Sequence, residues 1–180
     1  MNYPISTEEK DLIDRCLKND RAAQRSLYMK YKDAMFTILF RILNDREEAS
    51  DALQDVFVSV FKGLHQFKHQ STIGAWIKTI TVRTGIAKQK KLVKMYAEEL
   101  ESIQVSEPVV WPDGLTSEAL EKAIAALPDG YRTSFLLIEV EGYTHKEVAT
   151  MMNKSEGTSK SQLYHAKKAL QKILKDYRTG

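Results

Sequence analysis

Apolar residues recur every three or four positions through most of the first half of the chain, the spacing of amphipathic helices. A first helix is expected after a cap at Ser6-Thr7, a second over about 20–43, and a third after an Asn44-Asp45 turn. The apolar stripes of these helices comprise Leu12, Ile13 and Cys16; Leu27, Tyr31, Met35, Ile38, Leu39 and Ile42; and Leu53, Val56, Phe57, Val60, Phe61 and Leu64. Three such stripes can bury one another in one core.

The helical period lapses in two places. A polar stretch over 63–74, which contains histidine and glutamine, is typical of a loop, and Trp76, Ile77, Ile80 and Ile86 then resume a helix. Residues 98–114 hold two prolines, an acidic bias and no sustained period, which is typical of a linker.

The last third of the chain predicts a helix-turn-helix. Leu120, Ile124 and Leu127 indicate one helix, a turn is expected at 128–130, and the next helix ends at Gly142. Thr144 and Glu147 have the spacing of a capping box and begin a short helix. A turn over 153–156 leads into a long final helix. Its inward stripe is Leu163, Ala166, Leu170, Ile173 and Leu174.

The sequence therefore predicts an all-α protein of two small helical domains joined by a flexible acidic linker. We expect the domains at 1–94 and 118–180, with the linker at 95–117.

Charge is segregated along the chain although the net charge is only +3. Residues 1–91 carry 16 Lys/Arg and 11 Asp/Glu, residues 92–120 carry 1 and 6, and residues 121–180 carry 10 and 7. Two basic blocks thus flank an acidic segment. The chain has a single cysteine, which fits a reducing compartment. It has no apolar run near ~18 residues, and its first residues lack the pattern of a secretory signal peptide. We therefore expect a cytoplasmic protein without membrane insertion.

Each basic block has features that suit nucleic acid. Residues 56–97 hold eight Lys/Arg, no Asp/Glu and several aromatic residues, a combination that suits single-stranded DNA, although most of those aromatics fall on core stripes. The final helix is rich in lysine on the side opposite its apolar stripe, which suits the phosphates of duplex DNA. Its candidate contacts are Thr158, Lys160, Ser161, Gln162, Tyr164, His165, Lys167 and Lys168.

Catalytic and metal chemistry are not indicated. The chain has no phosphate-binding loop, nucleophile elbow or paired cysteines, and His65 and His69, the one pair of histidines at ligand spacing, have no nearby carboxylate. We therefore predict no metal, no cofactor and no enzymatic activity.

Two stretches resemble the extracytoplasmic-function (ECF) members of the sigma-70 family of bacterial RNA polymerase. Sigma region 2 is similar to DALQDVFVSVFKGLHQF at 51–67 with WIKTI at 76–80. Sigma region 4 is similar to 127–170, above all in EGTSKSQLYHAKKAL at its end. The resemblance implies a sigma factor that binds core polymerase and directs promoter-specific initiation.

The resemblance also implies roles for individual residues. Region 2 would dock on the clamp helices of the largest catalytic subunit through Asp51, Gln54, Asp55 and Phe57, where spacing alone indicates only a solvated face. Region 4 would rest on the polymerase flap and read the −35 duplex through the final helix. The single-stranded −10 element would be held by His65, Gln66, Phe67, Lys68, His69, Trp76, Lys78, Arg83, Lys88 and Lys90.

The sequence departs from the family pattern at four positions. Relatives commonly carry Asn and Asp where this chain has Arg83 and Ala87, and Arg is frequent where Gln162 and His165 stand. The hypothesis that follows is a relaxed promoter choice, or one that depends on another DNA-targeting partner. An anti-sigma factor is a further candidate partner. The alternative function is a stand-alone helix-turn-helix transcription regulator, and a metal-dependent nuclease is disfavoured by the missing carboxylate cluster.

Overall fold

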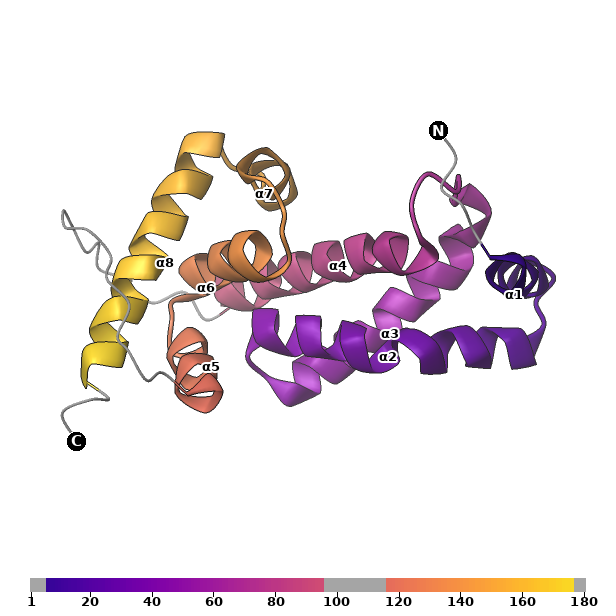
Figure 1. Ribbon diagram of the computed structural model, residues 1–180, viewed down its shortest axis with the longest axis horizontal. Helices are drawn as coiled ribbons and strands as arrows, with labels where there is room; N and C mark the ends of the chain where they lie inside the picture. The colour runs from indigo at the N-terminus through magenta and orange to yellow at the C-terminus, as the bar shows by residue number, and fades with distance from the viewer. Residues whose placement is uncertain (1–5, 96–115, 177–180) are drawn as a thin grey trace. The chain divides into compact units, whose positions relative to one another are not determined.

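The computed structural model describes residues 6–95 and 116–176, and every regular element in these ranges is a helix (Figure 1). The all-α prediction is thereby confirmed. The chain divides into two compact units, Met1–Lys88 and Gln89–Gly180. The predicted linker at 95–117 lies almost wholly outside the described residues, so its character stays a prediction.

The first unit is built from α1 (Thr7–Leu17), α2 (Arg21–Leu43), α3 (Arg46–Gly63) and most of α4 (Ile73–Met95). The predicted stripes form its core, and fully burying each large aliphatic side chain contributes roughly 1.5–3 kcal/mol. Its fully buried side chains are Ile13, Leu27, Leu39, Ile42, Val56, Val60, Ile73 and Ile77. Cys16 is buried among them, and this burial raises the pKa of its thiol.

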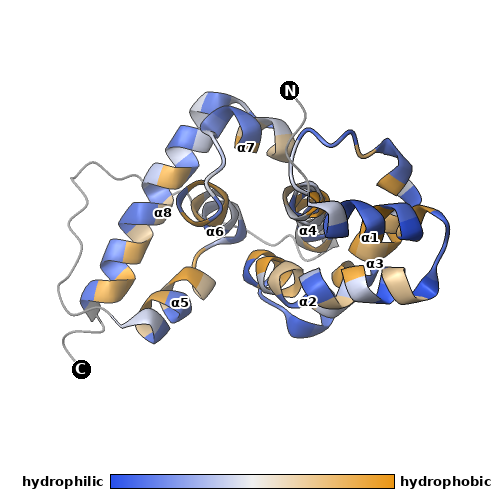
Figure 2. Cartoon of the chain, turned by 45° about the vertical axis from the view of Figure 1, so that its right-hand side comes forward, coloured by the Kyte–Doolittle hydropathy of each residue, from blue (hydrophilic) through white to orange (hydrophobic). Residues whose placement is uncertain are grey.

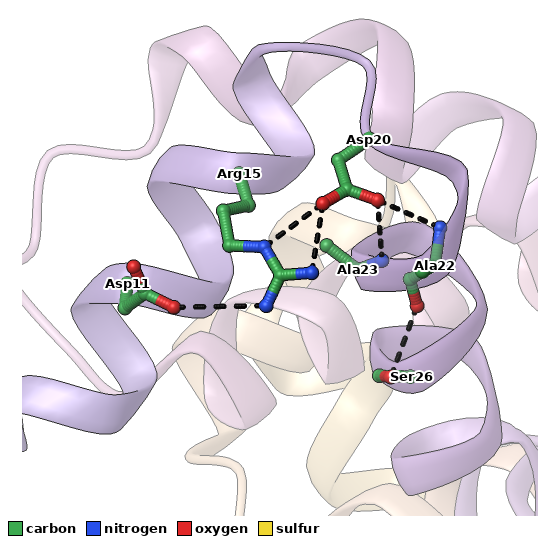
Figure 3. Close-up of polar contacts among 6 residues, drawn as sticks. All are labelled: Asp11, Arg15, Asp20, Ala22, Ala23 and Ser26. Carbon is green, nitrogen blue, oxygen red and sulfur yellow. Dashed lines mark hydrogen bonds and ion pairs between the residues drawn. The ribbon is translucent and has the colours of Figure 1, made fainter.

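Polar side chains fix the corner between α1 and α2. Asp20 accepts hydrogen bonds from the backbone N–H groups of Ala22 (2.8 Å) and Ala23 (3.2 Å), which caps α2. The Arg15 guanidinium reaches the same carboxylate at 2.8 Å (Figure 3). These hydrogen bonds, that of Arg15 first, hold the pKa of Asp20 below its ordinary value. The end of α1 and the start of α2 are thus held by one charged group.

The stretch over 63–74 is more ordered than the sequence predicted. A 3₁₀ turn, η1 (Leu64–Gln66), follows α3 directly, and Leu64 and Phe67 are both buried. These two apolar side chains pack the segment against the core. The sequence pattern did not predict this packing because the residues around them are polar. The helix α4 then begins at Ile73.

The second unit contains α5 (Ser117–Ala125), α6 (Asp129–Phe135), a π-helical turn η2 (Leu136–Val140), α7 (His145–Met152) and α8 (Glu156–Asp176). The predicted turn at 128–130 is wrong, because α6 already begins at Asp129 after the cap Pro128. Its first turn is held by the pairing of Asp129 with Arg132. In Figure 2 apolar and polar positions alternate along α8. The apolar ones join a core of Ala123, Leu127, Phe135, Leu163, Ala166, Leu170 and Leu174.

The helices α7 and α8 form the predicted helix-turn-helix. Thr144 and Glu147 make the capping box at the start of α7, and Asn153 ends it with a left-handed backbone (φ 54°). Nδ1 of His145 lies 3.1 Å from the Ser159 hydroxyl, which links α7 to the first turn of α8. The start of α8, the second helix of this motif, is therefore held by its contact with α7.

Candidate functional site

One exposed stripe of α3 carries most of the polar residues expected to dock on polymerase. Asp51, Gln54 and Asp55 are exposed, whereas Phe57 is 4% exposed and its ring lies against Tyr28 with centroids 4.8 Å apart. Val58 is 50% exposed. It lies one turn after Gln54, so it shares the outer face with the polar residues. Sequence reasoning missed Val58, although the same four-residue spacing could have found it.

The charges on this stripe differ in how far they are compensated. Lys88 of α4 lies 2.7 Å from Glu48 and 3.8 Å from Asp51, so the negative charge of Asp51 is partly offset. Asp55 forms no ion pair within the described residues. The stripe therefore offers one uncompensated carboxylate beside one exposed apolar side chain.

Three of the −10 residues expected in the segment between α3 and α4 have exposed side chains, His65, Gln66 and Lys68. Phe67 between them is 7% exposed and packs on Trp76, with ring centroids 5.5 Å apart. The ring of His69 packs on Phe67 at 4.7 Å, and its backbone is left-handed (φ 53°). The structure thus separates the expected −10 residues of this segment into a packed aromatic group and three accessible polar side chains.

Farther along α4 the predicted DNA-binding residues also differ in exposure. Trp76 is half-buried, with its ring 3.8 Å from the position that a side chain on Gly63 would take. Lys78 is half-buried and Arg83 is exposed. The Lys88 side chain is 19% exposed and is held by Glu48, and Lys90 is exposed in the part of α4 that belongs to the second unit.

The predicted −35 contacts that are exposed lie in the first half of α8, the recognition helix of the motif. Thr158, Lys160, Ser161 and Tyr164 are exposed there. The hydroxyl of Thr158 lies 2.8 Å from that of Ser155, whose oxygen also accepts the backbone N–H of Thr158 (3.0 Å). These contacts order the amino-terminal end of the helix that would enter a major groove.

Two other expected base readers are partly used inside the unit. Gln162 is half-buried and its Oε1 accepts a hydrogen bond from the Ser134 hydroxyl (2.9 Å). His165 is half-buried and stacks on Tyr131 with centroids 5.7 Å apart. Its Nδ1 is buried and has no hydrogen-bond partner among the residues that the structure describes, so Nε2 is the ring nitrogen left to meet a ligand.

The prediction that Lys168 lies on the open side of the last helix is wrong. Lys168 is 8% exposed, and its ammonium lies 5.9 Å from the centre of the Tyr164 ring. The aliphatic stem can be buried while the charge rests on an aromatic face, an arrangement that helical spacing alone does not reveal. Lys167, its neighbour, is half-buried and lies 2.8 Å from Glu139.

Within 6–95 and 116–176, no three His, Cys, Asp or Glu side chains gather where they could hold a metal ion. In the same ranges no helix is both long and apolar enough to cross a bilayer.

Comparison with protein families matches each unit to a separate model. Residues 27–92 match the family described as sigma-70 region 2, and residues 117–170 match sigma-70, region 4. Together the two matches cover two thirds of the chain, and they include the stripe of α3, the segment after it and the helix-turn-helix.

Curated relatives are similar over nearly the whole chain. The RNA polymerase sigma-H factor of Pseudomonas aeruginosa is 26% identical, with 93% of this chain and 95% of the relative covered. The ECF RNA polymerase sigma factor SigM of Mycobacterium tuberculosis is 24% identical, over 96% and 87%. SigW of Bacillus subtilis, named likewise, is 25% identical, over 93% and 97%.

Two solved structures share the fold. The sigma factor RpoE, solved with the anti-sigma factor NepR from Bartonella quintana, has a TM-score of 0.57 and 20% identity, over 84% of this chain and 96% of that one. CnrH, solved with the cytosolic domain of CnrY, has a TM-score of 0.55 and 17% identity, over 93% and 97%. The chain thus belongs to the sigma-70 family of RNA polymerase sigma factors, in its extracytoplasmic-function group.

Proposed function

We propose that this chain is the subunit that gives bacterial RNA polymerase its promoter choice, through three surfaces with separate tasks. The observation that carries the proposal is the order of the two family matches, region 2 before region 4, with a lysine-bearing helix-turn-helix in the second. The polymerase supplies the catalysis, so the chain itself is a non-enzymatic factor. Its proposed place of action is the cytoplasm.

The stripe of Asp51, Gln54, Asp55 and Val58 is the proposed docking surface for the clamp helices of core polymerase. An uncompensated carboxylate favours a basic partner surface, and an exposed valine gives the contact an apolar centre. Phe57 does not face the partner but anchors α3 in the core, because its ring is buried against Tyr28.

The two DNA surfaces are proposed to act at different stages. The first turns of α8 hold the −35 duplex, with Lys160, Ser161 and Tyr164 accessible and region 4 also resting on the polymerase flap. His65, Gln66 and Lys68 then contact bases of the −10 element as they leave the stack, and Arg83 holds the strand. Capture of unstacked bases shifts the DNA toward its open form.

Two kinds of regulator are part of the proposal. An anti-sigma factor is one, supported by the structurally similar sigma factor RpoE, which was solved with the anti-sigma factor NepR. A second DNA-targeting partner is the other. The resemblance implies Asn and Asp where this chain has Arg83 and Ala87, and both residues lie at exposed positions of α4.

Replacing His65, Gln66 and Lys68 together by alanine tests the −10 surface. With saturating template we expect initiation on a duplex promoter to fall about tenfold, because base capture contributes roughly 1–3 kcal/mol per base to opening. Initiation on a pre-melted template should fall much less, since its strands are already separated. Run-off transcription measures both.

The matched control is Lys10→Ala, which removes one positive charge from the exposed side of α1. Equal losses on both templates, or a loss as large in the control, would show that these three side chains do not act in strand opening.

A further inference from the structure

Two lysines of the recognition helix, the exposed Lys160 and the half-buried Lys167, form ion pairs with acidic residues of the same chain. Nζ of Lys160 lies 2.9 Å from Glu156, and Nζ of Lys167 lies 2.8 Å from Glu139. The third lysine of the predicted set, Lys168, is buried against Tyr164. Two of the five lysines of α8 are therefore paired with an acid of the same chain before any phosphate arrives.

The two ion pairs differ in strength. The pair of Lys160 and Glu156 joins adjacent turns of one helix, with side chains 61% and 50% exposed, so solvent screens it strongly. The pair of Lys167 and Glu139 joins two separate elements, with side chains only 31% and 37% exposed. Partial removal from water strengthens the attraction between opposite charges. Glu139 is therefore the stronger competitor for a lysine of the recognition helix.

Local backbone structure sets the position of Glu139. It lies in the π turn η2, where the N–H of Glu141 donates to the carbonyl of Leu136, five residues back, at 2.9 Å. Gly142 follows with a positive φ of 78°, which lets the N–H of Tyr143 return to the carbonyl of Leu137 (2.9 Å). Such single π turns are frequent at functional sites. Here the turn carries the carboxylate that meets α8.

We propose that Glu139 competes with DNA phosphate for Lys167 and thereby lowers the sequence-independent affinity of region 4 for duplex DNA. This inference rests on the proposed function, because it requires α8 to face the duplex. A phosphate that binds Lys167 must displace Glu139 and leave a carboxylate unpaired beside the DNA. Region 4 consequently depends on polymerase to deliver it to the promoter, since its own hold on DNA is weakened.

The test is Glu139→Gln in the full chain, with binding to a fluorescein-labelled duplex of random sequence followed by anisotropy. We expect binding to tighten about threefold to fivefold at ~50 mM salt. The slope of log affinity against log salt should steepen by about one, because Lys167 then makes one more phosphate contact. Circular dichroism confirms that the helices are retained.

Glu118→Gln is the matched control. It also removes one negative charge and breaks an ion pair, that of Glu118 with Lys122 (2.7 Å) in α5, outside the recognition helix. If Glu118→Gln tightens binding as much as Glu139→Gln, net charge explains the gain and the inference is overturned.

A double-mutant cycle with Lys167→Ala separates the inference from the proposed function. In the Lys167→Ala background, Glu139→Gln should no longer tighten binding. If Lys167→Ala weakens binding but Glu139→Gln leaves it unchanged in the parent chain, the inference alone fails. If Lys167→Ala itself has no effect on duplex binding, the placement of this part of α8 on DNA fails, and the inference fails with it.

Discussion

Asp55→Arg should weaken binding of the chain to core polymerase by about thirtyfold or more. The Asp55 carboxylate is exposed and makes no ion pair within the described residues, so its charge is available to a basic partner. Reversing that charge both removes an attraction and places two positive groups together, which costs about 2 kcal/mol or more at an interface. Fluorescence anisotropy with labelled chain and unlabelled core measures the change.

Asp33→Arg is the control for this substitution. Asp33 lies on α2 with its side chain 85% exposed, and reversing it changes the net charge of the chain by the same amount. Its binding to core should stay close to that of the parent chain. Equal weakening by both variants would mean that the stripe of α3 is not the docking surface.

Leu170→Ala should strongly destabilise the second unit while the first keeps its stability. Leu170 is fully buried in the core cluster of this unit, and a buried Leu→Ala change costs about 2–5 kcal/mol. At about 0.05–0.15 kcal/mol per residue, a unit that spans Gln89–Gly180 has a free energy of unfolding of about 5–14 kcal/mol. The substitution therefore removes a large share of that free energy.

The expected signature is a two-step loss of helical circular dichroism on heating, in which the step of the second unit moves to lower temperature by about 10 °C or more. Above that lowered step the variant should still bind core polymerase through the stripe of α3 but should lose initiation that depends on the −35 element. Val140→Ala, at a 46% exposed apolar position of the same unit, is the control and should leave both signals intact. Loss of all helical signal in a single step in Leu170→Ala would contradict the independence of the two units.

Local signals made the helices and their ends predictable. The cap at Ser6 and the capping box of Thr144 with Glu147 act within a few residues, so their sequence pattern determines their structure. The inward residues of α8 followed from helical spacing for the same reason, and Leu163 and Leu170 are both buried. The two DNA-binding blocks followed from the segregation of charge along the chain, whereas the polymerase surface and the promoter elements came from the resemblance to a known family.

Tertiary contacts determined what the sequence could not show. Helical spacing placed Phe57 on the inward stripe of α3, whereas the resemblance assigned it to polymerase docking, and its packing against Tyr28 shows that it is buried while Val58 is the exposed apolar neighbour. Lys168 is covered although its spacing indicated an open face. The pairing of Lys167 with Glu139 joins residues 28 positions apart through a π turn, which has no recognisable sequence signal.

The most direct test of the central claim is transcription by purified core polymerase with and without the chain, on fragmented genomic DNA and on a pre-melted template. The account predicts stable binding to core and transcripts from defined start sites that appear only when the chain is present. Initiation on the pre-melted template alone would indicate that another partner selects the DNA. Absence of core binding, with binding to duplex DNA retained, would contradict the account and favour a stand-alone regulator.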